Sequence, residues 1–158
     1  MDTRTAPIPL RLARVRDALR DLGLAAVWLP SSDPHLSEYL PERWQTRQWL
    51  SGFTGSMGTL AVTADAAALF ADSRYWQQAE RELEGSGIAL VKVAHSAIAT
   101  APADWLAAHV PAGQTVGVDL RDVALAVLGD DLLGAGLGLV GQLGEVGARL
   151  GEGHHIAG

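Results

Sequence analysis

The sequence predicts an α/β domain whose mixed sheet of about five to six strands is flanked by helices. Its 158 residues are enough for one domain with a substantial core. Hydrophobic residues make up 48% of the chain and charged residues 19%, which excludes a chain that is disordered throughout. Short apolar runs of strand length alternate with amphipathic segments of helical length, and this alternation is typical of α/β folds.

The first elements are a helix and a buried strand. The apolar residues of a helix predicted over 9–22 share one face: Leu12, Val15, Leu19 and Leu22. Gly23 ends this helix, and the apolar run 24–29 that follows, bounded by Gly23 and Pro30, predicts a buried strand.

A hairpin forms the middle of the predicted sheet. A polar loop over 31–41, about two helical turns over 43–50 and a glycine-rich connection over 51–58 precede it. Apolar runs at 59–63 and 67–71 are separated by three residues, which predicts two antiparallel strands joined by a tight turn.

The second half alternates helices and strands. A helix capped by Asp72 or Ser73 runs to about Glu84 and turns Trp76, Ala79 and Leu83 inward. Further segments are strands over 88–93 and 115–119 and helices over 102–110 and 123–133. Because helical crossovers favour parallel strand pairs, the sheet is expected to be mixed.

The domain core is predicted over residues 1–128, followed by a glycine-rich end over 129–158. Ten of the last thirty residues are glycine, a density that costs backbone entropy in any regular element. A last weak strand over 137–141 and a linker or tail are expected there.

Charge and cysteine content exclude several classes of function. The net charge is −6, so a broad phosphate-binding face and nucleic-acid partners are not expected. No cysteine is present, which excludes a disulfide framework and a thiol nucleophile. Neither a secretory signal nor an apolar run long enough to cross a bilayer is recognised, so a cytoplasmic protein without membrane contact is expected.

The segment 31–39 concentrates one imidazole, two carboxylates and three serines. Its chemistry-bearing residues include Asp33, His35, Glu38 and Tyr39. A Ser-His-Asp triad needs its base between nucleophile and orienting carboxylate in space, which neighbours in one short loop seldom achieve. Helix capping by Asp33 is therefore favoured over nucleophilic catalysis.

The segment 51–59 carries glycines at positions 52, 55 and 58. This spacing differs from G-x-G-x-x-G, and a strand follows where a dinucleotide site needs a helix. Turns with positive φ, or a close backbone approach, explain these glycines better.

Two further groups could form contacts. Arg74 and Tyr75 lie at a strand-to-helix junction, where Arg74 could bind a carboxylate, although ordinary helix packing explains them equally well. Trp44, Arg47 and Trp49 fit core packing or a subunit interface. No metal site is predicted, because H-E-x-x-H is absent and the only histidine pair lies in the glycine-rich end.

Three motifs in order resemble the N-terminal domain of Xaa-Pro aminopeptidases, the creatinase/prolidase N-terminal domain family. They are LPSSDPHLSEYL at 29–40, WLSGFTGSMGT at 49–59 and FADSRYW at 70–76. The resemblance covers about residues 9–120 and implies a ribonuclease-H-like α/β layer. It also implies that catalysis belongs to a separate C-terminal pita-bread domain, where two Asp, one His and two Glu hold a dinuclear, usually manganese, centre.

No stretch of this sequence matches that ligand set, so the chain alone is expected to hold no cofactor and to be inactive. In the family, the N-terminal domain helps to form homo-oligomers and walls the entrance for the peptide substrate. Carried over, the candidate contact residues are Asp33, His35, Glu38, Tyr39, Trp44, Arg47, Trp49, Arg74 and Tyr75. Two alternatives stay open: a free-standing module that binds a peptide or carboxylate, and an independent hydrolase that uses His35.

Overall fold

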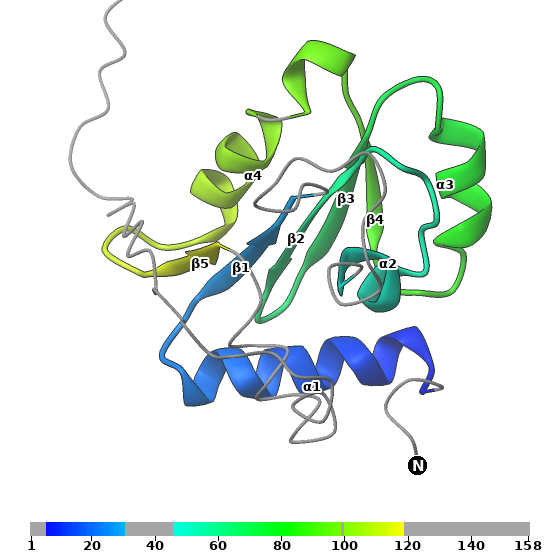
Figure 1. Cartoon of the computed structure of the whole chain (residues 1–158). Helices are drawn as coiled ribbons and strands as arrows, with labels where there is room; N and C mark the ends of the chain where they lie inside the picture. The colour runs from blue at the N-terminus through cyan, green and yellow to red at the C-terminus, as the bar shows by residue number, and fades with distance from the viewer. Residues whose placement is uncertain (1–5, 31–45, 99, 119–158) are drawn as a thin grey trace, which may run out of the picture.

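The computed structural model describes residues 6–30, 46–98 and 100–118, and the structural statements below concern these residues. They form a five-stranded mixed sheet in the order β4-β3-β2-β1-β5, with helices on both faces (Figure 1). The predicted α/β class and mixed sheet are confirmed. The predicted loop over 31–41, the helix over 123–133, the strand over 137–141 and the boundary at 128 lie outside the described residues.

The strands are β1 (Ala26–Leu29), β2 (Thr59–Thr63), β3 (Ala67–Ala71), β4 (Ala89–Lys92) and β5 (Val116–Val118). The helices are α1 (Ile8–Asp21), α2 (Thr46–Ser51), α3 (Trp76–Glu82), α4 (Ala101–His109) and the short 3₁₀ helix η2 (His95–Ala97).

A tight turn between β2 and β3 forms the predicted hairpin. The Thr63 amide donates to the Ala66 carbonyl over 2.8 Å, and the Thr63 hydroxyl donates to Asp65 Oδ1 over 3.0 Å. β2 is antiparallel to both β1 and β3, whereas β4 is parallel to β3 and β5 is parallel to β1. Four strands, β1, β3, β4 and β5, therefore run in one direction and end at the same edge of the sheet.

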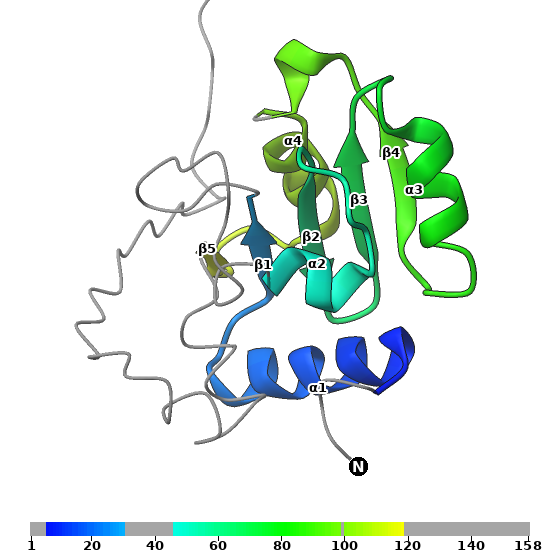
Figure 2. The same cartoon turned by 45° about the vertical axis from the view of Figure 1, so that its right-hand side comes forward.

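One face of the sheet carries the larger core, under α1, α2 and α3 (Figure 2). Alternate strand residues with branched side chains point to this face: Val27, Leu29, Leu60, Val62 and Leu69. Burial of a side chain of this kind contributes about 1.5–3 kcal/mol. Successive residues of a strand point to opposite faces of the sheet. Because helices cover both faces, consecutive residues of each central strand are apolar.

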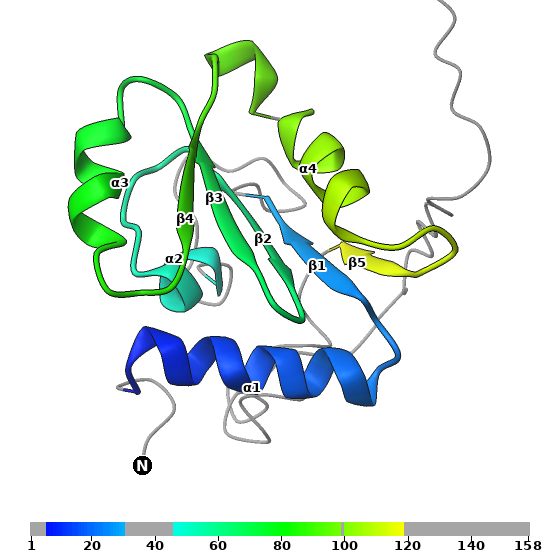
Figure 3. The same ribbon diagram turned by 180° about the vertical axis from the view of Figure 1, so that it is seen from behind.

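The other face of the sheet lies beneath α4 (Figure 3). It is built differently, from alanines and aromatic rings. Ala26, Ala61 and Ala68 are buried there. Because alanines leave room above the sheet, two large rings fill it: Phe70 meets Trp105 of α4 edge to face, with centroids 6.1 Å apart.

The end of α1 differs from the prediction. Leu22, predicted to lie on the buried stripe, is 46% exposed because the helix ends at Asp21. Gly23, with φ of 69°, donates to the Arg20 carbonyl, and Leu24 donates to the Leu19 carbonyl over 2.8 Å. These bonds form a Schellman motif that turns the chain toward β1, so Leu24 packs on the core in place of Leu22.

The glycine-rich connection folds tightly over Phe53, and both explanations predicted for its glycines, positive φ and close approach, are confirmed. Gly52 adopts a φ of 73°. A Cβ atom on Gly55 would lie 2.2 Å from Phe53 Cζ, and one on Gly58 would lie 3.1 Å from the same ring. The glycines at 55 and 58 are therefore required by close approach to a fully buried side chain.

Gly55→Ala should lower the free energy of unfolding by about 2–3 kcal/mol, because the Phe53 ring has no room to move. Gly23→Ala is the matched control. Its φ of 69° is strained for alanine but its Cβ would meet nothing within 4 Å, so about 1 kcal/mol is expected. Urea unfolding measures both, and equal losses would contradict the close-approach account.

Candidate functional site

The sheet topology gathers polar residues at the edge where β1, β3, β4 and β5 end. Asp72 follows β3 directly, and His95 follows β4 at the start of η2. β2 begins at this same edge, so the connection that carries Ser56 reaches it too. The carboxyl ends of parallel strands are the usual position of binding sites in α/β sheets.

Asp72 is the centre of this edge. Its side chain is 2% exposed and is held by two neighbours that are themselves largely exposed. Arg74 binds it through two nitrogens, from Nε to Oδ1 over 3.0 Å and from Nη2 to Oδ2 over 2.7 Å. His95 Nδ1 lies 2.9 Å from Oδ2. The buried carboxylate therefore links the β3–α3 junction to the segment that follows β4.

The tautomer of His95 follows from this contact. Its Nδ1 lies near both Asp72 Oδ2 and Arg74 Nη2, which is 3.2 Å away. Nδ1 cannot donate to the first and accept from the second at once. The shorter contact is to a charged acceptor, so Nδ1 carries the hydrogen and donates to Asp72.

Residues 72–75 form a turn that holds Arg74 against Asp72. The prediction that Asp72 or Ser73 caps the following helix is wrong. The Arg74 amide donates to Asp72 Oδ1 over 3.0 Å, and the Tyr75 amide donates to the Asp72 carbonyl over 3.0 Å. α3 begins only at Trp76, with no side-chain cap. Neither Asp72 nor Ser73 caps it, because the Asp72 carboxylate is occupied by Arg74 and His95.

Hydrogen bonds from Arg74 hold the pKa of Asp72 well below its usual range. Burial opposes this shift by disfavouring the charged carboxylate, and the hydrogen bond from His95 reinforces it. The carboxylate is therefore ionised in the folded protein at neutral pH.

Tyr75 extends the edge toward the glycine-rich connection. Its hydroxyl lies 2.6 Å from the Ser56 hydroxyl, and its ring meets Phe53 edge to face with centroids 6.0 Å apart. The Arg74 guanidinium lies over the same ring, 5.3 Å from its centroid. Tyr75 thus contacts both Arg74 and the glycine-rich connection.

Glu82 of α3 anchors the same connection. It accepts hydrogen bonds from the Thr54 amide over 2.9 Å and the Thr54 hydroxyl over 2.6 Å. Burial alone would raise the pKa of Glu82, but the bonds from Thr54 and Gln78 lower it below its ordinary value. The connection is therefore fixed between α3 and the core.

Arg47 lies inside the fold, where it is 7% exposed. Its Nη2 donates to the Gly55 carbonyl over 2.7 Å, and its guanidinium lies 5.1 Å from the Phe53 centroid. Burial lowers its pKa to about 10. Arg47 thus supports the glycine-rich connection from below.

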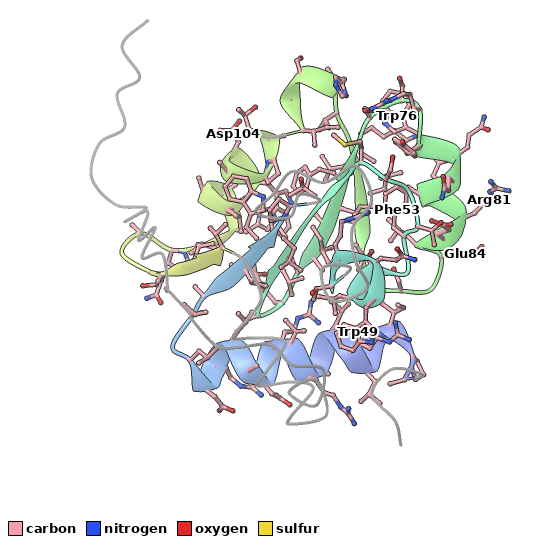
Figure 4. All side chains as sticks on the ribbon, viewed as in Figure 1. Trp49, Phe53, Trp76, Arg81, Glu84 and Asp104 are labelled. Carbon is pink, nitrogen blue, oxygen red and sulfur yellow. The ribbon has the colours of Figure 1, made fainter. Side chains whose placement is uncertain are left out.

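Trp49 lies beside α1 (Figure 4). It packs against the larger core, and the Arg11 guanidinium lies over its ring and donates to its backbone carbonyl. This placement ties α2 to α1.

The structure brings together only part of the predicted site. Arg74 and Tyr75 lie side by side, whereas Arg47 and Trp49 lie beneath the connection and against α1. The remaining candidates fall outside the described residues: Asp33, His35, Glu38, Tyr39 and Trp44. His95 and Ser56 were not among the site residues predicted from the sequence. The position of His95 just after a strand parallel to β3 is the signal that could have identified it.

The described residues also contain a pocket that lies away from this edge. A pocket of about 330 Å³ lies at the opposite edge, between Ala25, Asp65 and His109. Across the described ranges, no three His, Asp or Glu side chains gather in a way that could hold a metal ion. No described helix is long and apolar enough to cross a membrane.

Asp72→Asn should lower the free energy of unfolding by about 1–2 kcal/mol at neutral pH, because charge-assisted hydrogen bonds become neutral ones. The folded pKa lies below the unfolded value of about 3.9. The contribution is therefore complete above about pH 4 and declines as the pH falls further.

Urea unfolding at neutral pH and at about pH 3 tests this, since the difference between wild type and variant should shrink in acid. Asp17→Asn is the control, because Asp17 forms an exposed ion pair with Arg20 and should cost almost nothing. A pH-independent difference would contradict the assigned pKa.

The family comparison agrees with the fold. The sequence model of the creatinase/prolidase N-terminal domain family matches residues 11–129 of this chain. Xaa-Pro aminopeptidase 2 of Mus musculus is 43% identical over 110 residues, which are 70% of this chain and 16% of that protein. Xaa-Pro aminopeptidase ApepP of Drosophila melanogaster is 40% identical over 125 residues, which are 79% of this chain and 19% of that protein. This chain thus spans less than a fifth of these relatives.

Solved structures show the same architecture. The X-prolyl aminopeptidase from Caenorhabditis elegans, described as a cytosolic enzyme with a di-nuclear active site, superposes with a TM-score of 0.62 at 33% identity. The match covers 71% of this chain and 20% of that one. The N-terminal domain of the cytoplasmic peptidase PepQ from Mycobacterium tuberculosis superposes with a TM-score of 0.51 at 27% identity. The match covers 80% of this chain and 85% of that one. This chain belongs to the creatinase/prolidase N-terminal domain family.

Proposed function

We propose that this chain serves as the non-catalytic N-terminal domain of a metal-dependent Xaa-Pro aminopeptidase. Its role is to assemble homo-oligomers and to shape the access of peptide substrates to a catalytic domain in adjoining polypeptide. The observation that carries the proposal is the extent of the match, since the chain corresponds to one domain at the N-terminal part of much longer Xaa-Pro aminopeptidases.

The chemistry of the described residues supports this division of labour. A dinuclear metal centre needs several convergent carboxylate and imidazole ligands. The polar edge instead holds one buried carboxylate that is engaged by Arg74 and His95. A cation at this place would compete with the Arg74 guanidinium for Asp72, so these residues do not fit a metal centre. The proposed manganese belongs to the catalytic domain.

The polar edge itself is a suitable contact surface. Arg74 and His95 are largely exposed, and Tyr75 lies beside them. Arginine and tyrosine are enriched at the energetic centres of protein interfaces. We assign this edge to the contact with the catalytic domain or a second subunit, in a cytoplasmic protein like the Caenorhabditis elegans relative.

The purified chain, incubated with an Xaa-Pro peptide and Mn²⁺, should release no N-terminal residue. Peptide cleavage is followed by mass spectrometry, with an intact Xaa-Pro aminopeptidase as the positive control. Turnover that is lost in His95→Gln or Arg74→Gln would show that the chain has its own active site and would overturn the proposal.

Light scattering tests the assembly role separately. A mass above that of one chain is expected at micromolar concentration, and Arg74→Glu should lower it if the polar edge forms the contact. A strictly monomeric chain would contradict self-assembly through this domain.

A further inference from the structure

Two polar groups at the edge are held rigidly but have unused binding capacity. Asp72 accepts four hydrogen bonds, three from Arg74 and one from His95. A carboxylate offers about four acceptor positions, so Asp72 can take no more. Arg74 Nη1 and His95 Nε2 have no hydrogen-bond partner among the described residues, and their side chains are 56% and 67% exposed.

This rigidity lowers the cost of binding a ligand. The Arg74 fork is fixed by two bonds to Asp72 and by the Tyr75 ring, and His95 is fixed by its bond to Asp72. Side chains that are already ordered lose little conformational entropy when a ligand binds. Their position outside the carboxyl ends of β3 and β4 is also where α/β sheets bind ligands.

The charge of the cluster indicates which ligand fits. Asp72 and Arg74 cancel, so the cluster is neutral while His95 is neutral. Because Nδ1 donates to Asp72, neutral His95 presents Nε2 as an acceptor, and protonation turns it into a donor. A ligand with one negative charge that arrives with one proton leaves the cluster neutral. A dianion would leave excess negative charge beside Asp72.

We infer that Arg74 and His95 bind a carboxylate at this edge and that His95 takes up a proton from solvent as it binds. Arg74 Nη1 and protonated His95 Nε2 donate to the carboxylate oxygens. The inference rests on the proposed function only for the source of the ligand, which is the C-terminal carboxylate of a peptide. An acidic side chain of adjoining polypeptide offers the same chemistry.

The elements next to His95 carry two further charged groups among the described residues, Lys92 and Asp104. Lys92 of β4 pairs with Glu80 of α3 over 2.6 Å and lies over the Trp76 ring, so it is neutralised. α4, which follows η2, carries Asp104 in its first turn. Among the described residues, Asp72 and Arg74 are the charged groups in direct contact with the imidazole.

NMR titration of the histidines, with acetate as the probe and chloride at equal ionic strength as the reference, tests the coupling. Saturating acetate should raise the midpoint of the His95 titration by about one pH unit if the protonated form binds about tenfold more tightly. Arg74→Gln should abolish the effect of acetate on His95. Arg74→Lys, which keeps a cation beside Asp72, should leave only part of it.

His109 is the internal control, because it is an exposed histidine on α4 whose Nδ1 contacts the Trp105 carbonyl. Its midpoint should not respond to acetate. An unchanged His95 midpoint, or an equal shift in Arg74→Gln or at His109, would overturn the inference.

The source of the carboxylate is resolved by three further probes. Gly-Pro-Gly with a free C-terminus should shift the His95 midpoint, and its C-terminal amide should not. An effect of N-acetylglutamate amide that exceeds that of the free peptide would assign the site to an acidic side chain instead. These measurements need no catalytic domain. Carboxylate binding can therefore be absent while the proposed function holds, and it can be present while the proposed function is wrong.

Discussion

The direction of the central hairpin constrains everything else in this molecule. β2 and β3 are buried along their whole length, so they can form only the middle of the sheet. Because β2 runs against both neighbours, β1 and β3 point the same way, and the parallel partners β4 and β5 follow them. The three-residue turn at Ala64–Ala66 thereby decides that four strands deliver their following residues to one edge. A parallel pair in place of this hairpin would scatter those residues over two edges.

Asp72 joins the segments that follow β3 and β4 at that edge. A buried carboxylate without partners would be costly, and here two side chains from separate segments satisfy it. The same bonds order Arg74 and His95, whose outer faces remain in solvent. One buried charge thus stabilises the junctions after β3 and β4 and fixes the groups that a partner or ligand would meet. Stability and the proposed recognition at this edge would therefore depend on the same interaction.

The two faces of the sheet serve different purposes. Branched residues and three helices make one face the main core, whereas alanines under α4 accommodate Phe70 and Trp105 on the other. Arg47 and the glycines at 55 and 58 belong to neither core but keep the connection before β2 folded against the domain. This connection carries Ser56 to Tyr75. The relatives are much longer chains, and a connection held in place at the polar edge would suit the contact proposed for it.

The sequence by itself determined the class, the order of the predicted elements that lie within the described residues, the hairpin and the need for glycines after α2. All of these follow from local periodicity, turn residues and the steric freedom of glycine, which depend on near neighbours in the chain. The prediction that Leu22 is buried is wrong, because the Schellman motif at Gly23 places Leu24 on the core instead. The prediction that Asp72 or Ser73 caps α3 is also wrong. Only the tertiary structure decided that Asp72 binds Arg74 and His95. His95 lies twenty-three residues further along the chain, and no local pattern encodes a contact that arises from the parallel pairing of β3 with β4.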